Sequence, residues 1–306
     1  MGRIAFVFPG QGAQSRGMGR GLYEKSPAAR LVFDNADKIR PGTVEQCFSG
    51  SAEELARTEN TQPCLYCVDL AAASALAEAG IKADMLAGFS LGELAALAFS
   101  GAVTYDDGFR LVCERARFMQ EASAVTGSGM AVVLKQTDEE VIALCEKFDN
   151  VYPVNFNCEG QVSVAGVEDE LVRFMAAVKE AGGRAAPLKV GGGFHSPFMA
   201  GASERFVETL KRFTIAQPGI PLYSNVTAQP YDGDYKELLA RQIRSPVLWR
   251  KTIINMIDAG ADTFIEVGPG KTLCNLVSRI SDRVQVFNVE DGAGLEKTIL
   301  GVCASA

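Results

Sequence analysis

The sequence predicts an α/β fold in which a parallel sheet carries a smaller, inserted α+β subdomain. Two observations predict it. Apolar runs typical of strands alternate with helical patterns up to about residue 122, and such alternation forms a parallel sheet covered by helices. From residue 127 to residue 190 the order becomes strand, helix, strand, strand, helix, strand, that of a ferredoxin-like unit. We therefore expect a large hydrolase-like α/β core from residues 1–126 and 191–306, with a small ferredoxin-like subdomain at 127–190.

The first part of the core is predicted element by element. The short apolar run "RIAFVF" reads as a buried strand and is followed by the glycine-rich loop "PGQGAQSRGMGRG". Helical patterns follow around 27–39 and 62–80. A strand, a tight turn and a helix then occupy 85–99, and a further helix spans about 105–122.

The inserted segment and the last part of the core follow. In the segment, the predicted elements are the strand "GMAVVL", the helix "TDEEVIALCEKF", the strands "VYPVNFN" and "QVSVAG", the helix "EDELVRFMAAVKEAG" and the strand "RAAPLKV". After it we expect helices at 198–212, 234–244 and 249–260, the strand "TFIEVG", and a helix from about 271.

The composition is that of a globular protein and argues against nucleic-acid binding. The hydrophobic fraction is 47% and the net charge is −7. The pI of about 5.0 is unlike that of nucleic-acid binders, which are usually basic. The most apolar window, Met85 to Val103, contains Glu93 and several glycines, so we interpret it as core and expect no membrane partner.

The eight cysteines indicate a reducing compartment. They are scattered along the chain, and the N-terminal "MGRIAFVFPGQG" reads as a core strand and turn without an export signal. We therefore expect reduced thiols and a cytoplasmic protein. Cys64 and Cys67 form a C-x-x-C pattern inside a long helical segment with no second ligand pair nearby, which favours buried structural thiols over a redox or zinc site.

Ser90 has two interpretations. Ser90 and Glu93 have the S-x-x-E spacing of a capping box, and an apolar helical run follows them. Ser90 is also the centre of "GFSLG", a G-x-S-x-G pattern between an apolar strand and a helix, which is the context of a nucleophile elbow. Glycines suit such a turn because the strand and helix backbones crowd each other there. These residues alone do not decide whether Ser90 is a helix cap or a nucleophile.

His195 is the single histidine of the chain and the only imidazole able to activate a serine. It lies in "VGGGFHSPFMAGAS", after three glycines and before a predicted helix, and such a loop can direct a side chain into a cleft. The alternative is a surface or capping histidine. One histidine supplies too few ligands for the usual histidine-rich catalytic zinc, so we expect no metal.

Two glycine-rich segments resemble phosphate loops only in part. "PGQGAQ" follows a strand but lacks the third glycine of a dinucleotide-binding loop. Gly270, Lys271 and Thr272 end like a Walker A loop, but Ile265 stands where its first glycine belongs. We therefore expect no bound nucleotide cofactor, and we interpret "GPG" as a rigid turn after a buried strand.

Arg115 shares a predicted helical face with apolar residues. Leu111, Val112, Phe118 and Met119 lie three or four positions from it, so Arg115 is expected to point partly inward while Arg117 points elsewhere. An inward arginine requires a partner carboxylate, and a carboxylate on a substrate would meet its guanidinium fork. A solvated helical arginine is the alternative.

Four segments in order along the chain resemble one family. "FVFPGQGAQ" (6–14), "GFSLGE" (88–93), "GFHSPFM" (193–199) and "EVGPGK" (266–271) resemble the malonyl-CoA:acyl carrier protein transacylases of fatty-acid synthesis. "PVNFN…GQVSVAG" and "RLV…RARFMQEA" extend the resemblance over nearly the whole chain. The combination favours the nucleophile interpretation of Ser90.

The resemblance implies a role for each matching residue. Ser90 matches the acylated nucleophile, His195 the general base, and Gln242 the residue whose backbone carbonyl orients the histidine. Gln11 and Leu91 match the two residues whose backbone N–H groups form the oxyanion hole, and Arg115 matches the arginine that binds the malonyl carboxylate. An amide following an elbow nucleophile does face the developing oxyanion.

The activity implied is ping-pong transfer of malonyl from malonyl-CoA, through a malonyl-serine, to the phosphopantetheine thiol of acyl carrier protein. No metal or redox cofactor is implied. The partners are therefore malonyl-CoA and acyl carrier protein, and a monomer is expected. Because acyl carrier proteins are acidic, docking needs a local basic patch, for which the candidates are Arg184, Lys189, Arg244 and Arg250.

The chain departs from the family pattern in two places. Phe89 stands before the serine where the family commonly has histidine, and Cys158-Glu159 replaces a frequent Ser-Pro. We expect Phe89 to point away from Ser90 and to fill a pocket wall. Phe194, before His195, accompanies malonyl in related polyketide acyltransferases, since a bulky ring leaves little room for a methyl branch.

Three alternatives stay open beside the fatty-acid enzyme. A serine hydrolase shares G-x-S-x-G, but hydrolysis of a neutral ester has no use for an inward Arg115. A non-catalytic scaffold for carrier protein has no use for the Ser90 and His195 pair. A stand-alone polyketide acyltransferase is the nearest alternative, and one sequence without its gene neighbours does not separate it from the fatty-acid enzyme.

Overall fold

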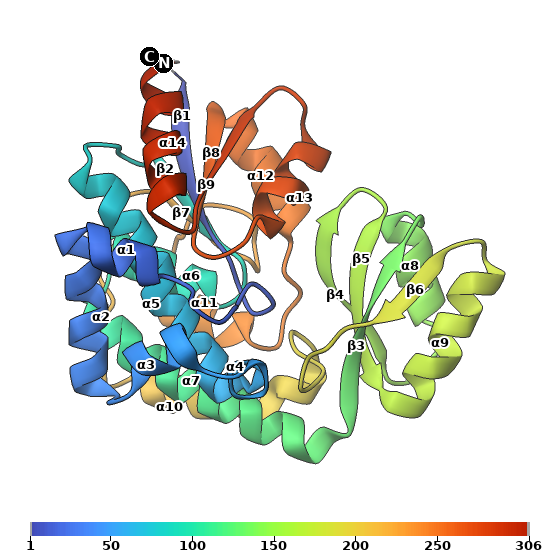
Figure 1. Cartoon of the computed structure of the whole chain (residues 1–306). Coiled ribbons are helices and arrows are strands. Elements are labelled where there is room, and N and C mark those ends of the chain that lie inside the picture. Colours follow the sequence, from blue (N-terminus) through green and yellow to red (C-terminus); the bar gives the residue numbers. More distant parts are fainter. Residues whose placement is uncertain (1, 305–306) are drawn as a thin grey trace.

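The large part of the fold is organised around a five-stranded parallel sheet. The computed structural model describes residues 2–304. The strand order is β7-β2-β1-β8-β9, and every neighbouring pair runs parallel (Figure 1). Their bounds are Arg3–Phe8 for β1, Met85–Gly88 for β2, Leu222–Tyr223 for β7, Ala261–Val267 for β8 and Gln285–Val289 for β9.

Helices cover both faces of this sheet, as the burial of β1 demonstrates. Phe6 and Phe8 are fully buried in one cluster with the central helices, whereas Ala5 and Val7 are buried in a second cluster with Trp249 and the helices near it. This alternation is the two-residue period of a strand buried on both faces. The helices are α1 Arg20–Lys25, α2 Pro27–Ile39, α3 Thr43–Ser49, α4 Ala52–Ala56, α5 Thr58–Glu78, α6 Gly92–Phe99, α7 Tyr105–Thr126, α10 Ala200–Leu210, α11 Tyr235–Gln242, α12 Trp249–Asp258, α13 Thr272–Ile280 and α14 Gly292–Ala304, with a 3₁₀ turn at Pro197–Met199.

The small part is a four-stranded antiparallel sheet with two helices. Its strands are β3 Ser128–Leu134, β4 Val151–Cys158, β5 Gln161–Val167 and β6 Arg184–Pro187, and its helices are α8 Asp138–Cys145 and α9 Glu168–Glu180. The strand order is β4-β5-β3-β6. Ala131 and Val133, two residues apart on β3, share a cluster with Val141 of α8 and Phe174 of α9, so both helices pack on one face. The predicted fold class, a parallel core with a ferredoxin-like unit, is confirmed.

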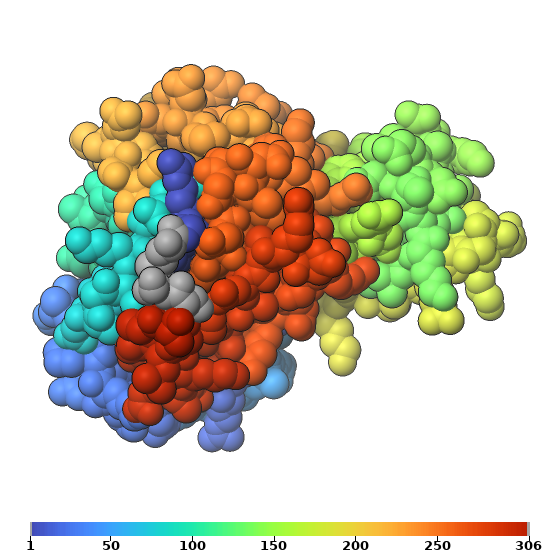
Figure 2. All heavy atoms as spheres, turned by 90° about the horizontal axis from the view of Figure 1, so that it is seen from above, coloured from blue at the N-terminus to red at the C-terminus, as the bar shows by residue number. Residues whose placement is uncertain are grey.

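The small sheet projects from one side of the large part, and a backbone connection joins the two. Figure 2 shows the green and yellow residues of the small sheet standing beside the orange and red C-terminal segments. Val247, before α12, accepts from the Phe156 N–H over 3.0 Å and donates to the Val154 carbonyl over 2.8 Å. The exposed edge of β4 is thereby paired with the large part. The division of the chain at residues 127 and 190 stays a prediction.

Helix α5 is buried along most of its length and contains the C-x-x-C pattern. Cys64 and Cys67 are buried free thiols on α5, and burial raises the pKa of the Cys67 thiol well above its usual value. Such thiols pack as small apolar side chains and are poor nucleophiles at neutral pH. Within residues 2–304, no helix combines the length and the apolar character that a membrane crossing requires.

Candidate active site

Ser90 occupies a strained turn between β2 and α6. Its φ is 55°, in the left-handed region that residues other than glycine rarely adopt. A side chain at Gly88 would overlap the Gly92 backbone, and one at Gly92 would overlap the Phe8 carbonyl. The two glycines of G-x-S-x-G are therefore required by close backbone packing, and the turn is the elbow that the pattern predicts.

The interpretation of Ser90 and Glu93 as a capping box is wrong. Leu91 is the N-cap of α6, and its side chain makes no capping hydrogen bond. The Ser90 hydroxyl instead contacts His195 and Arg115, and the Glu93 carboxylate is bonded to other residues. Tertiary contacts outcompete the local cap because both side chains face the interior.

His195 approaches Ser90 from the glycine-rich loop before α10. Its Nε2 lies 2.7 Å from Ser90 Oγ, and its Nδ1 lies 2.9 Å from the backbone carbonyl oxygen of Gln242. A carbonyl only accepts, so Nδ1 carries the proton and Nε2 accepts the serine O–H. The loop is held by the Ser196 hydroxyl, which donates to the Gly193 carbonyl over 2.5 Å. This arrangement suits a neutral imidazole that takes a proton from Ser90.

The environment keeps His195 in that neutral form. Burial, together with the nearby positive charge of Arg115, lowers its pKa to about 4, although hydrogen bonding to the backbone of Gln242 and Ser245 acts in the opposite direction. An imidazole with this pKa is unprotonated throughout the neutral range. The base is therefore available without a partner carboxylate.

Arg115 is fully buried on α7, more so than its helical face alone predicted. Its Nη1 donates to Gln62 Oε1 over 2.7 Å, and its Nη2 donates to Ser90 Oγ over 3.1 Å and to Gln242 Oε1 over 2.8 Å. Its pKa is lowered to about 10, because burial outweighs the opposing charge of Glu93, so the group is a cation at neutral pH. Its Nε finds no partner among the described residues.

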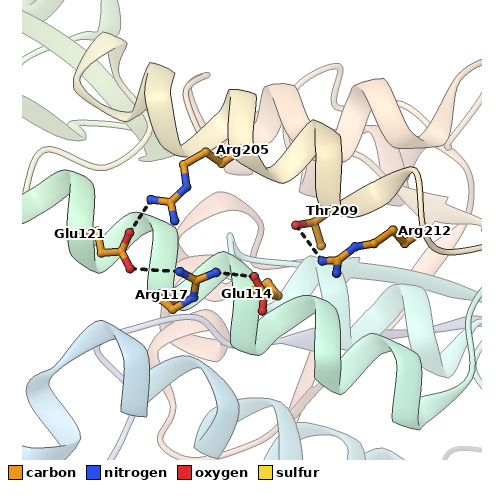
Figure 3. A network of polar contacts seen from close by, with 6 residues as sticks. All are labelled: Glu114, Arg117, Glu121, Arg205, Thr209 and Arg212. Atoms are coloured by element: carbon orange, nitrogen blue, oxygen red, sulfur yellow. Dashed lines mark hydrogen bonds and ion pairs between the residues drawn. The ribbon is translucent and has the colours of Figure 1, made fainter.

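Within residues 2–304, no carboxylate accepts a hydrogen bond from Arg115. All three acceptors of its hydrogen bonds are neutral side chains. Arg117, by contrast, is exposed and donates hydrogen bonds to Glu114 and Glu121 on α7 (Figure 3). The buried guanidinium thus retains the capacity to bind an external carboxylate beside Ser90.

Gln242, at the end of α11, connects all of these groups. Its backbone carbonyl oxygen lies 2.9 Å from His195 Nδ1, and its side chain forms further hydrogen bonds that the sequence did not indicate. Nε2 donates to the Ser90 carbonyl over 2.6 Å and to Glu93 Oε2 over 2.9 Å, while Oε1 accepts from Arg115. One glutamine therefore touches the nucleophile, the base and the cation.

Sequence reasoning missed Asn225 and Gln62. Asn225, two residues after β7, accepts from the Ser90 N–H over 2.7 Å and donates to the Gly88 carbonyl over 2.6 Å. It thereby satisfies two backbone groups of the elbow that the tight turn leaves unpaired. Gln62 lies on α5 and orients Arg115. No local pattern marks either residue, because each acts on a segment distant in the sequence.

Gln11 and Leu91 lie on the two loops that meet at the elbow. A side chain at Gly10 would overlap the Phe89 carbonyl, so the loop after β1 packs directly against the turn. Gln11 Nε2 donates to the Thr58 hydroxyl over 3.2 Å. Within residues 2–304, neither the Gln11 N–H nor the Leu91 N–H has an acceptor. Two backbone donors are thus available next to the elbow for a developing oxyanion.

A cavity of about 290 Å³ lies between the two sheets at this end of the molecule. Its lining residues are Pro9, Gly10, Gln11, Gly12, Ala13, Phe89, Val132, Asn155, Asn157, Gln161, Ser163, Leu188, Thr272, Leu273 and Leu276. Phe89 packs against Trp249 with 5.4 Å between ring centroids and forms part of the wall, as expected. Because Gly10, Gln11 and Phe89 line it, the cavity adjoins the elbow.

Comparison with known proteins identifies the family. The acyl transferase domain family matches residues 5–297. A malonyl CoA-acyl carrier protein transacylase of Bacillus subtilis is 38% identical, over 98% of this chain and 97% of that protein. The crystal structure of such a transacylase from Clostridium perfringens has a TM-score of 0.96 at 38% identity, over 99% and 98% of the two chains. A malonyl-transacylase solved with a type II polyketide acyl-carrier protein has a TM-score of 0.94 at 31% identity, over 98% and 99%. The chain belongs to the acyl transferase domain family, among its malonyl CoA-acyl carrier protein transacylases.

Proposed function

We propose that the protein is an acyl carrier protein S-malonyltransferase, which moves malonyl from malonyl-CoA to acyl carrier protein and so supplies fatty-acid synthesis. One observation carries the proposal. The Ser90 hydroxyl lies within hydrogen-bond distance of both a neutral imidazole and a buried guanidinium. A nucleophile beside a base fits acyl transfer, and a cation beside that nucleophile fits an acyl group that ends in a carboxylate.

The first half-reaction acylates Ser90. His195 Nε2 takes the hydroxyl proton while Oγ attacks the thioester carbonyl carbon of malonyl-CoA. The carbonyl oxygen becomes an oxyanion, which the backbone N–H groups of Gln11 and Leu91 stabilise. The carbon–sulfur bond breaks, His195 returns the proton to the CoA sulfur, and a malonyl-serine ester remains.

The second half-reaction runs the same steps with a different thiol. The phosphopantetheine thiol of acyl carrier protein gives its proton to His195, and its sulfur attacks the ester carbonyl. The oxyanion uses the same two N–H donors, the carbon–oxygen bond breaks, and the proton returns to Ser90 Oγ. Atoms and protons balance over the cycle without a metal or redox cofactor.

Arg115 selects the acyl group in this mechanism. One methylene separates the malonyl carboxylate from the reacting carbonyl, and Arg115 Nη2 lies 3.1 Å from the attacking oxygen. A bound malonyl group replaces this contact with a charge-assisted hydrogen bond to its carboxylate. Phe194, which is 6% exposed beside His195, leaves little space for a methyl branch.

Acyl carrier protein and CoA both bear a phosphopantetheine arm, which in this proposal occupies the cavity beside the elbow. Of the cations proposed to meet the acidic carrier protein, Arg184, Lys189 and Arg244 are exposed. Arg250 is instead paired with Asp138 at 3.2 Å, which connects α12 to α8 of the small part. All eight cysteines are free thiols, which supports a cytoplasmic location.

The test is transfer of radiolabelled malonyl from malonyl-CoA to phosphopantetheinylated acyl carrier protein, with the Ser90→Ala variant beside the wild type. We expect labelled carrier protein with the wild type and none above background with the variant. Release of free malonate at the same rate with and without carrier protein would instead indicate a hydrolase and would reject the proposal.

A further inference from the structure

Glu93 is a buried carboxylate beside the reacting groups, and the mechanism above gives it no part. It lies on α6, three residues after Ser90, and its side chain is fully buried. The Tyr231 hydroxyl donates to one carboxylate oxygen. Gln242 Nε2, over 2.9 Å, and the Asn225 N–H, over 3.2 Å, donate to the other. Because both oxygens of this carboxylate accept hydrogen bonds, the carboxylate fixes the orientation of the groups that donate them.

The Gln242 amide is held in one orientation by these contacts. Its two N–H groups donate to Glu93 and to the Ser90 carbonyl, and its oxygen accepts from Arg115. In a flipped amide, the oxygen would face the Glu93 carboxylate and the Ser90 carbonyl, which are both acceptors. The N–H groups would face the Arg115 guanidinium, which only donates. Glu93, as an ionised carboxylate, offers no hydrogen that a flipped amide could use. It therefore selects the orientation that gives Arg115 an acceptor.

Glu93 also supplies the negative charge nearest to Arg115 in this network. Gln242 lies between the two charged groups, so they interact without a direct hydrogen bond. The charge of Glu93 favours the cationic form of Arg115, and the charge of Arg115 disfavours protonation of His195. Loss of the Glu93 charge leaves the guanidinium uncompensated beside the base, which weakens the base.

We propose that Glu93 is a positioning residue for malonyl transfer. Through the Gln242 amide it orients Arg115 toward the malonyl carboxylate, and it holds the Gln242 backbone carbonyl against His195. Both effects require the ionised carboxylate. The inference rests on the proposed function, because its readout is the formation of the malonyl-serine ester.

The requirement for an ionised Glu93 gives the wild-type enzyme a distinctive pH profile. The Glu93 pKa is raised to about 7, because burial outweighs the opposing effects of the donors Tyr231, Gln242 and Asn225 and of the charge of Arg115. Tyr231 keeps its proton, since burial and Glu93 raise its own pKa well above the usual value. His195 stays neutral down to a pH of about 4. We therefore expect the acylation rate to fall as the pH drops through about 7 and Glu93 is protonated.

The experiment compares Glu93→Gln with Glu266→Gln. Glu266 is a suitable control because it is also fully buried and its pKa is also raised to about 7. Its carboxylate, however, accepts hydrogen bonds from the Leu273 and Cys274 N–H groups of α13. Single-turnover acylation by malonyl-CoA is followed by rapid quench and intact mass from pH 5 to pH 9, with thermal unfolding measured on each protein.

We expect Glu93→Gln to acylate at least about tenfold more slowly at pH 8, because small displacements of reacting groups cost one to two orders of magnitude in rate. The inflection near pH 7 should be absent from Glu93→Gln and present in the wild type and in Glu266→Gln. Wild-type rates in Glu93→Gln would overturn the inference. So would a slower Glu93→Gln that keeps the inflection, since loss of structure alone leaves the titration in place.

A second variant covers the case in which Glu93→Gln does not fold. Tyr231→Phe keeps the aromatic packing and removes the donor that lowers the Glu93 pKa. The inflection should move to higher pH, and an unmoved inflection would overturn the inference. A wild-type protein that forms no malonyl ester would instead reject the proposed function, which separates the two failures.

Discussion

Arg115 Nη2 donates a 3.1 Å hydrogen bond to the Ser90 hydroxyl, so the buried cation directly touches the nucleophile. An arginine at this distance can hold the far end of only a very short acid while its other end is attacked. Malonyl has one methylene between its two carbonyl carbons and meets that condition. The guanidinium that selects the acyl group therefore lies directly beside the oxygen that attacks it.

Arg115→Lys tests this relationship. Lysine keeps the charge but loses the planar fork that reaches Gln62, Gln242 and Ser90 together. A hydrogen bond to a charged group contributes about 1.5–3 kcal/mol, which is about ten- to hundredfold in rate. We expect kcat/KM for malonyl-CoA to fall by that factor, with a smaller change for acetyl-CoA, in steady-state transfer assays.

Arg117→Lys is the matched control. Arg117 lies two residues further along α7, is exposed, and forms ion pairs with Glu114 and Glu121 (Figure 3). Surface pairs of this kind contribute little, so its kcat/KM should stay within about twofold of the wild type. Equal losses in both variants would show that Arg115 does not act on the acyl group.

The single histidine permits a direct titration. In ¹H NMR the His195 ring protons are the only histidine signals, and they should shift with a pKa of about 4, below the usual 6.5. Arg115→Gln removes a charge that lowers this pKa, so its midpoint should move upward. A wild-type midpoint near 6.5 would contradict the buried, neutral base.

The same depressed pKa has a consequence for stability. Below pH 6.5 the unfolded chain binds a proton at His195 that the folded chain does not bind until about pH 4. The contribution of His195 to the free energy of unfolding is therefore full above pH 6.5 and decreases as the pH falls toward 4. Urea denaturation of the wild type and of His195→Gln should show a shallower decrease in the variant over this window. Parallel curves would contradict the shift.

Gly92→Ala tests the close packing at the elbow. A methyl group there would overlap the Phe8 carbonyl and crowd Pro9, so we expect a loss of several kcal/mol in the free energy of unfolding. Gly201, on α10, has nothing within 4 Å of an added methyl group. Gly201→Ala should instead stabilise by about 0.5–1 kcal/mol, because alanine favours a helix. Chemical denaturation measures both, and a neutral Gly92→Ala would contradict tight packing.

The order of strands and helices was predictable because it rests on local patterns. "RIAFVF", the strand and helix around Ser90, and the β-α-β-β-α-β segment each have a period or a turn signal of their own. β7 was not predicted, since a two-residue strand has no period, and β9 and α14 at the end of the chain were not predicted either. α1, α3 and α4 are likewise short, and their residues are ordered by packing on α2 and α5.

The residues of the site likewise fall into those that local sequence motifs mark and those that they do not. Ser90, His195 and Arg115 stand in motifs and could be proposed as functional from sequence. Asn225 and Gln62 could not, because nothing nearby in the sequence marks a side chain whose bonds go to residues 53 to 137 positions away. Glu93 was misread for the same reason: the local S-x-x-E spacing was visible, while its distant donors were not.

The central claim is that Ser90 becomes a malonyl ester, and intact-mass spectrometry tests it most directly. The protein is mixed with malonyl-CoA, acetyl-CoA or methylmalonyl-CoA, and Ser90→Ala is treated alongside. The account predicts a mass increase of one malonyl group with malonyl-CoA alone, located on Ser90 by peptide mapping and absent from the variant. An equal adduct with acetyl-CoA, or a malonyl adduct that persists in Ser90→Ala, would contradict it.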